Sequence, residues 1–118
     1  FVDTRTLAAS ATEDLDLAGG LTDSYGTTLT FTKIKAIIIK AAATNTNNVQ
    51  VTRPASNGLV AFMAASDGIA LTPGACFALI APDANGIAVT AGTGDLLTIT
   101  NSAGTTGVTY DIVIVGTV

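Results

Sequence analysis

Short apolar runs alternate with clusters of turn residues along the whole chain. Within a run, polar and apolar positions tend to alternate, as in residues 28–31, where Leu29 and Phe31 fall on one face and two threonines on the other. This two-residue period is typical of a strand with one buried face. No long segment combines helical apolar spacing with good helix formers, so the pattern predicts an all-β protein with little or no helix.

The runs recur about every 8 to 12 residues, which is the spacing expected of a sandwich or barrel. We expect about eight or nine short strands that form a single-domain antiparallel β-sandwich, jelly-roll-like, over residues 1–118. Proline after Arg53 marks a strand end or a sheet edge. The candidate runs for these strands are 12–20, ending in a turn at Gly19 and Gly20, and 26–32, 33–41, 49–51, 59–64, 69–71, 75–81, 87–89, 96–100 and 108–116.

The last run has the pattern of a central strand. Tyr110, Ile112 and Ile114 share one of its faces. The opposite face carries Val113 and Val115, so the end of the run is apolar on both sides. A strand that is covered on both faces and paired on both edges has this composition.

The run 33–43 carries three of the five basic residues of the chain, interleaved with isoleucines. On a regular strand Lys33 and Lys35 would share a face with Ile37 and Ile39. One explanation is local: a bulge or a short helical turn near residues 32–35 resets the alternation, and the strand proper starts at residue 36. The other is intermolecular: a neighbouring subunit covers the isoleucines while the lysines lie at its rim. We favour the local reset.

The intermolecular explanation defines a candidate interface with another subunit or with a partner surface. A few positive charges on such an interface would fix the register against an acidic surface. The alternative is that the basic residues only keep sheet edges soluble, and we favour it because exposed ion pairs contribute little. The candidate interface residues are Lys33, Lys35, Ile37, Ile39 and Arg53.

Charge is sparse and its balance is acidic. The 118 residues include five Lys and Arg against nine Asp and Glu, for a net charge of −4. Nucleic-acid binding needs many basic residues on one face, so no nucleic-acid partner is expected. The longest uncharged stretch near the middle, 68–82, is interrupted by proline and glycine and is too short to span a bilayer, so no membrane partner is expected either. A surface with so few charges suits a protein that other protein covers.

Catalytic chemistry has few candidate residues. The chain contains no histidine, which removes the usual base for a serine or cysteine nucleophile. Asp14 and Asp16 share a strand face, and a solvated face explains them better than an acid–base pair does. Residues 82–86 resemble part of a calcium loop but lack its later ligands, so a tight turn is the better interpretation. We therefore expect no catalytic residues, no metal site, no cofactor and no small-molecule substrate.

Cys76 is the only cysteine. It lies in an apolar run and has no histidine to activate it and no second cysteine to pair with. We expect a small buried hydrophobic side chain rather than a reactive thiol.

The order of runs and turns from about Thr4 to the end resembles small β-sandwich proteins encoded among the virion genes of tailed bacteriophages. The resemblance is carried by "DLDLAGGLTDSYGTTLTFTKIKAIIIKAA" and by the phrases "PGACFALIAP", "VTAGTGDLLTITN" and "YDIVIVG". Those proteins look like head decoration or cement proteins. The resemblance implies a non-enzymatic virion protein, made in the bacterial cytoplasm, that binds the outer capsid surface. Its partners would be the major capsid protein and copies of itself, as a trimer or a dimer.

Two other function classes stay open. The first is a structural module of a phage tail, tail fibre or spike, which copy number per particle would distinguish. The second is a carbohydrate-binding or adhesive β-sandwich, which usually needs exposed aromatic side chains. The chain begins with Phe1 rather than Met, and two explanations stay open: an N-terminal piece that was removed or is disordered, or a chain given from a later starting point.

Overall fold

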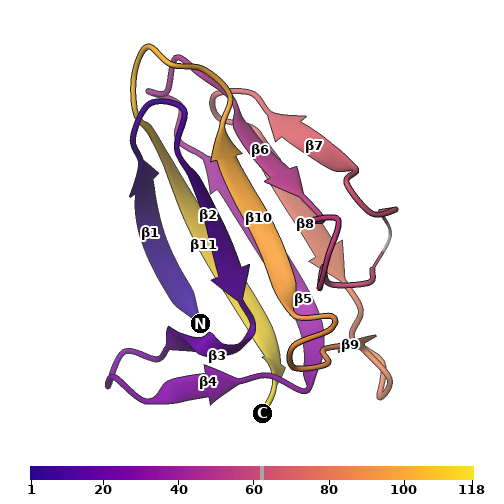
Figure 1. Cartoon of the computed structure of the whole chain (residues 1–118). Coiled ribbons are helices and arrows are strands. Elements are labelled where there is room, and N and C mark those ends of the chain that lie inside the picture. The colour runs from indigo at the N-terminus through magenta and orange to yellow at the C-terminus, as the bar shows by residue number, and fades with distance from the viewer. Residues whose placement is uncertain (62) are drawn as a thin grey trace.

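The computed structural model describes residues 1–61 and 63–118, which form eleven strands and no helix (Figure 1). With no helix in these residues, none is long and apolar enough to cross a membrane. The strands are β1 (Val2–Leu7), β2 (Thr12–Asp16), β3 (Ala18–Thr22), β4 (Thr28–Thr30), β5 (Lys33–Ala41), β6 (Val49–Thr52), β7 (Gly68–Leu71), β8 (Cys76–Ile80), β9 (Ile87–Ala88), β10 (Leu96–Asn101) and β11 (Val108–Thr117).

Two antiparallel sheets pack face to face. Sheet A has the strand order β1-β11-β5-β8, with β9 also paired to β5, and sheet B has the order β2-β10-β6-β7. The short hairpin β3–β4 forms a third sheet across one end of the sandwich (Figure 1). The radius of gyration, 13.6 Å, is that of one compact globule of this length.

The connectivity is that of a jelly roll. If the eight strands of the two main sheets are numbered along the chain without β3, β4 and β9, their orders become 1-8-3-6 and 2-7-4-5. Each neighbouring pair is antiparallel, and consecutive strands pass between the two sheets except at the β6–β7 hairpin, which lies within sheet B; this is the double Greek-key arrangement. The all-β sandwich expected from the sequence is confirmed. The described residues contain more strands than expected because β1 was not expected and because residues 12–20 contribute to two strands, β2 and β3.

The expected turn at Gly19 and Gly20 is wrong, because β3 runs through both residues. The chain leaves sheet B at Leu17, between β2 and β3. Leu17 is fully buried. The Leu17 N–H donates to the carbonyl of Asp95, and the Leu17 carbonyl accepts from Phe31 N–H. Gly20 then passes so close to Asp16 that a Cβ at Gly20 would lie 2.6 Å from the Asp16 Cβ.

The expected strand within 59–64 is also wrong for the residues that the structure describes there. Residues 59–61 and 63–64 are not in a strand, and Phe62 lies outside the described residues. Leu59 is buried and its N–H donates to the Leu96 carbonyl at 2.8 Å, so this apolar segment closes over β10 instead of joining a ladder.

The core lies between the sheets and is dominated by the pair β5 and β11. Inward-facing Ile37, Ile39, Ile112 and Ile114 are at most 1% exposed, and Tyr110 is fully buried beside them. The expected central position of the last strand is confirmed, since β11 lies between β1 and β5. Leu15, Val49, Val51, Leu97 and Ile99 complete the core from sheet B.

A bulge in β5 resets its alternation at the lysines. Val115 pairs with Ala36 and the next residue, Gly116, pairs with Ile34, so Lys35 is left without a partner on β11. Ile34 therefore points into the core and Ala36 points outward, although residues two positions apart share a face on a regular strand. The local explanation is confirmed as a bulge, but the strand starts at Lys33 rather than at residue 36.

Gly116, opposite the bulge, leaves no room for a side chain. A Cβ there would lie 2.4 Å from the Lys33 carbonyl oxygen and 2.9 Å from the Phe31 ring. We expect Gly116→Ala to lower the free energy of unfolding by about 1–3 kcal/mol, because the added methyl overpacks this corner.

Gly94→Ala is the matched control, since its Cβ would meet no atom closer than 3.9 Å and its φ is not positive. Chemical denaturation of both variants measures the difference. Equal stabilities for the two variants would contradict the close packing at Gly116.

Candidate functional site

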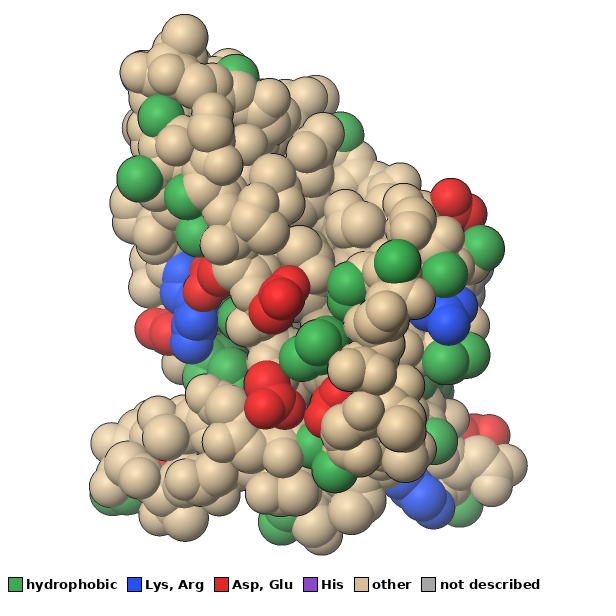
Figure 2. Space-filling model, in the orientation of Figure 1, with side chains coloured by type: hydrophobic (Ala, Val, Ile, Leu, Met, Phe, Trp, Pro, Cys, Tyr) green, Lys and Arg blue, Asp and Glu red, His purple; other side chains and the backbone are tan. Residues whose placement is uncertain are grey.

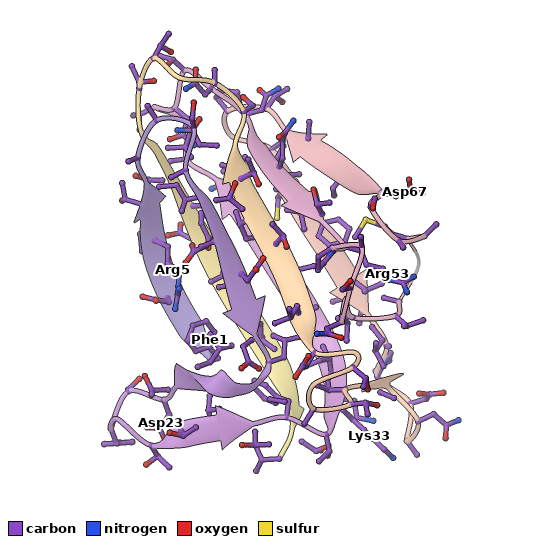
Figure 3. The ribbon with its side chains drawn as sticks, viewed as in Figure 1. Phe1, Arg5, Asp23, Lys33, Arg53 and Asp67 are labelled. Atoms are coloured by element: carbon purple, nitrogen blue, oxygen red, sulfur yellow. The ribbon has the colours of Figure 1, made fainter. Side chains whose placement is uncertain are left out.

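A cluster of polar side chains closes the side of the sandwich where β1 faces β2. Arg5 projects from β1, Glu13 from β2 and Tyr110 from β11. The Arg5 Nη1 donates to Glu13 Oε2 at 2.7 Å, and the Tyr110 hydroxyl donates to the other oxygen, Glu13 Oε1. Arg5 Nε also donates to Asp3 at 3.0 Å, and its guanidinium lies 5.8 Å from the centre of the Phe1 ring (Figure 3).

The environment of this cluster keeps Tyr110 protonated. Burial, followed by the hydrogen bond and charge of Glu13, raises the pKa of Tyr110 far above its ordinary value of 10. Partial burial lowers the pKa of Arg5, but the hydrogen bond and charge of Glu13 outweigh it, so that pKa is raised as well. Glu13 thus carries a charge-assisted bond on each oxygen and ties sheet A to sheet B. With both oxygens occupied, its chemical role is to hold the sheets together.

The structure places Lys33 and Lys35 against one loop of the same chain. The Lys33 ammonium donates to the Ala84 carbonyl at 3.1 Å, and the Lys35 ammonium donates to the Asp83 carbonyl. This loop is the expected tight turn, in which the Gly86 N–H donates to Asp83 Oδ1 at 2.8 Å. The two lysines therefore hold the β8–β9 connection.

The other candidate interface residues do not join them. Ile37 and Ile39 lie in the chain's own core, which leaves no surface there for a neighbouring subunit. Arg53 follows β6 in sheet B, away from Lys33 (Figure 3), and donates from Nη1 to the Met63 carbonyl at 2.8 Å. Figure 2, which views the molecule over sheet B, shows the basic side chains apart from one another at the periphery of that face.

The carboxylates of β2 also lie as expected of a solvated strand face. Asp14 is exposed and accepts a hydrogen bond from the Thr98 hydroxyl across the strands at 2.5 Å. Asp16 accepts from the Ala18 N–H at 2.8 Å. No group of three or more metal-ligating side chains occurs in the described part of the chain.

A buried asparagine pair, which the sequence pattern did not predict, closes the end of the sandwich where β10 connects to β11. Asn47 Nδ2 donates to Asn101 Oδ1 at 3.0 Å and to the Thr106 carbonyl at 2.9 Å. Asn101 Nδ2 donates to the Ala8 carbonyl at 3.0 Å. These amides bond backbone groups of two connections, β1–β2 and β10–β11, and Asn47 itself lies in a third, β5–β6, so the role is structural. The feature of the sequence that could have predicted this pair is an asparagine, Asn101, at the end of an apolar strand.

The outward face of sheet A carries apolar side chains that are not part of the core. Its strands all project apolar side chains away from the core, in two adjacent rows that cross the sheet. The exposed fractions reach 75% at Val2, 57% at Ile80 and 53% at Val115. The rows are Val2, Val113, Ile38 and Ala78, and next to them Val115, Ala36 and Ile80; we call these seven residues the apolar face.

Cys76 lies beside the apolar face and is exposed, so the expectation of a buried thiol is wrong. The cause is the alternation of β8: Phe77 and Leu79 turn toward the core, which places Cys76, Ala78 and Ile80 outside. The run was apolar on both strand faces, and the sequence alone could not say which side was covered.

A groove of about 330 Å³ adjoins the apolar face at the end where the hairpin lies. Phe1, Leu29, Phe31, Val115 and Val118 contribute its apolar walls. Val118 is 75% exposed, so the apolar surface continues around this end of sheet A.

Comparison with protein-family models, with curated proteins and with solved structures gave no match to this chain.

A Tyr25→Phe variant isolates Tyr110 as the single tyrosine of the chain. Because its pKa is raised, Tyr110 should form no phenolate when the pH passes 10, until the protein unfolds. Above this pH the unfolded chain releases the proton and the folded chain keeps it, so the free energy of unfolding should fall as pH rises. Phenolate absorbance and circular dichroism, recorded together, check this.

Tyr110→Phe should remove that part of the decline in stability at high pH, while Tyr25→Phe should keep it. Phenolate absorbance that develops near pH 10 while the native circular dichroism persists would contradict the buried Tyr110–Glu13 contact.

Proposed function

We propose that this chain is a non-enzymatic structural protein of a virion that decorates the outer surface of a capsid and stabilises the head. It acts through contact with other proteins, and its partners are the major capsid protein and further copies of itself. No step of this function needs a catalytic group, a metal ion or a cofactor.

The observation that carries the proposal is the apolar face. It spans all four main strands of sheet A and presents aliphatic side chains, with Val2, Val115 and Ile80 each more than half exposed. Apolar surface of this extent on the flat side of a sheet favours contact with another protein over contact with water. Lys33 and Lys35 are hydrogen-bonded to carbonyls of their own chain, and the overall charge is low. Electrostatic repulsion therefore does little to oppose apolar contact at this face.

The architecture supports the same proposal by analogy. Jelly rolls recur in viral capsid proteins, and also in lectins and cupins, so the fold favours a virion protein without deciding the function. The resemblance of the chain to phage head decoration proteins points the same way. The polar contacts at one side and at one end of the sandwich, Glu13 with Arg5 and Asn47 with Asn101, favour a durable scaffold.

A tail, tail-fibre or spike module would use the same scaffold and differ in copy number. A carbohydrate-binding module would use exposed aromatic side chains. Tyr25 is 95% exposed at the tip of the β3–β4 hairpin, but no other tyrosine of the described chain is exposed beside it to form a sugar platform. We therefore rank decoration of the head first.

Adding the purified chain to heads that lack it tests the proposal. We expect bound copies in a fixed ratio to the major capsid protein and comparable to it in number, and a higher temperature of head disruption. Quantitative mass spectrometry and thermal disruption of the heads measure the two effects.

Only a few bound copies per particle would indicate a tail component. Absence of binding, with the chain shown to be folded, would contradict decoration of the head.

A further inference from the structure

The outward side of sheet A carries charges only beside the apolar face. The row next to Val2, Val113, Ile38 and Ala78 consists of Thr4, Asp111, Lys40 and Cys76, one from each strand. At the other end of the apolar face lies Lys33, paired with Thr117. Any partner that covers the apolar face must therefore satisfy these charges at its edges.

Asp111 and Lys40 are neighbours across β11 and β5 but form no ion pair with each other. Asp111 accepts a hydrogen bond from the Thr4 hydroxyl at 2.6 Å. Lys40 is exposed and makes no hydrogen bond or ion pair with the part of the chain that the structure describes. Each charge thus remains available to an opposite charge from outside.

The face complements itself under one particular rotation. A two-fold axis parallel to the strands, between β5 and β11, exchanges these two strands and exchanges β1 with β8. Val113 then lies over Ile38 of the second copy, and Asp111 lies over its Lys40. Because the operation is two-fold, each of these contacts occurs twice. From this pattern we propose that the apolar face binds a second copy of this chain in an isologous, face-to-face pair.

The charges also select this orientation over the alternative. A two-fold axis perpendicular to the strands, through the middle of the apolar face, would leave β5 over β5. Lys40 would then meet the end of the second copy's β5 that carries Lys33. Like charges in such a contact oppose association, so the axis parallel to the strands is preferred.

The size of the face makes the pair weak. The two apolar rows and the charged row beside them extend roughly 20 Å along four strands about 4.8 Å apart, which gives a flat area of about 400 Å² per copy. A stable interface of standard size covers about 800 Å² per partner. The pair should therefore form at high concentration in solution, and more readily where many copies are held close together. The inference rests on the proposed function only in this last point, since it names the self-contact that a crowded surface would favour.

A covalent cross-link placed across the proposed interface tests its geometry. Thr4 of one copy lies over Cys76 of the other, whereas within one chain β1 and β8 are three strand spacings, about 14 Å, apart. Sheets packed face to face lie about 10 Å apart, which is too far for a direct disulfide, so a short bifunctional thiol cross-linker is used. We expect cross-linked Thr4→Cys protein to form covalent dimers in which position 4 of one copy is joined to Cys76 of the other, identified by peptide mass spectrometry.

Thr12→Cys is the matched control. Thr12 is exposed on an edge strand and bonded to a threonine of the next strand, as Thr4 is bonded to Asp111, but it lies on the outward side of sheet B. Thr12→Cys protein should form few covalent dimers. Equal yields from the two variants, or a Thr4→Cys product without the 4–76 cross-link, would overturn the proposed pair.

Charge reversal tests the Asp111–Lys40 contacts independently. Lys40→Asp and Asp111→Lys should each raise the dissociation constant about tenfold, since each creates two like-charge contacts. The double variant exchanges the charges and should restore association. Sedimentation equilibrium of the full chain measures the dissociation constant, and thermal unfolding confirms that each variant is folded.

Ala78→Asp should likewise prevent association, and Ala70→Asp, at an exposed alanine on the edge strand of sheet B, should not. A wild-type chain that stays monomeric at every concentration tested would overturn the inference. If such a monomer still binds heads, the proposed function stands without the pair; if the pair forms and heads are not bound, the proposed function fails and the pair stands.

Discussion

The antiparallel pairing of β5 with β11 is the interaction on which the rest of the structure depends. These are the two longest strands, and each has a neighbour on its other side, so sheet A is assembled around them. Their inward isoleucines, such as Ile39 and Ile112, are fully buried against sheet B. Their outward side chains, Ile38 and Val113, form the middle of the apolar face. One pairing therefore sets both the core and the surface offered to a partner.

The bulge at Lys35 shows how the same pairing positions the basic side chains of Lys33 and Lys35. It lets Ile34 turn inward and directs the Lys33 and Lys35 ammonium groups to the carbonyls of the β8–β9 connection. A cluster that looks like a charged patch in the sequence thus serves as an internal clamp. Asp111 and Lys40 lie beside the apolar face without forming an ion pair with each other, which is why self-complementarity becomes the strongest specific feature of that surface.

Alternation and turn chemistry were sufficient to predict the all-β sandwich, the central position of β11 and the reset near the lysines. They could not predict that Cys76 faces outward, since an apolar run on an edge strand looks the same whichever side is covered. Gly19 and Gly20 resembled a turn, although a positive φ requires glycine at position 19 and the close approach to Asp16 requires it at position 20. The Glu13–Tyr110 tie joins residues distant in the chain, and only the fold brings them together.

Native-state amide hydrogen exchange tests the central claim most directly. If the β5–β11 pair organises the molecule, the amides of Ile38 and Val113 should exchange only through global unfolding, with a free energy equal to that from denaturation. Amides of the edge strand β7 and of the β3–β4 hairpin should exchange through smaller openings. Exchange of the β5 and β11 amides as fast as those of β7 would contradict the account.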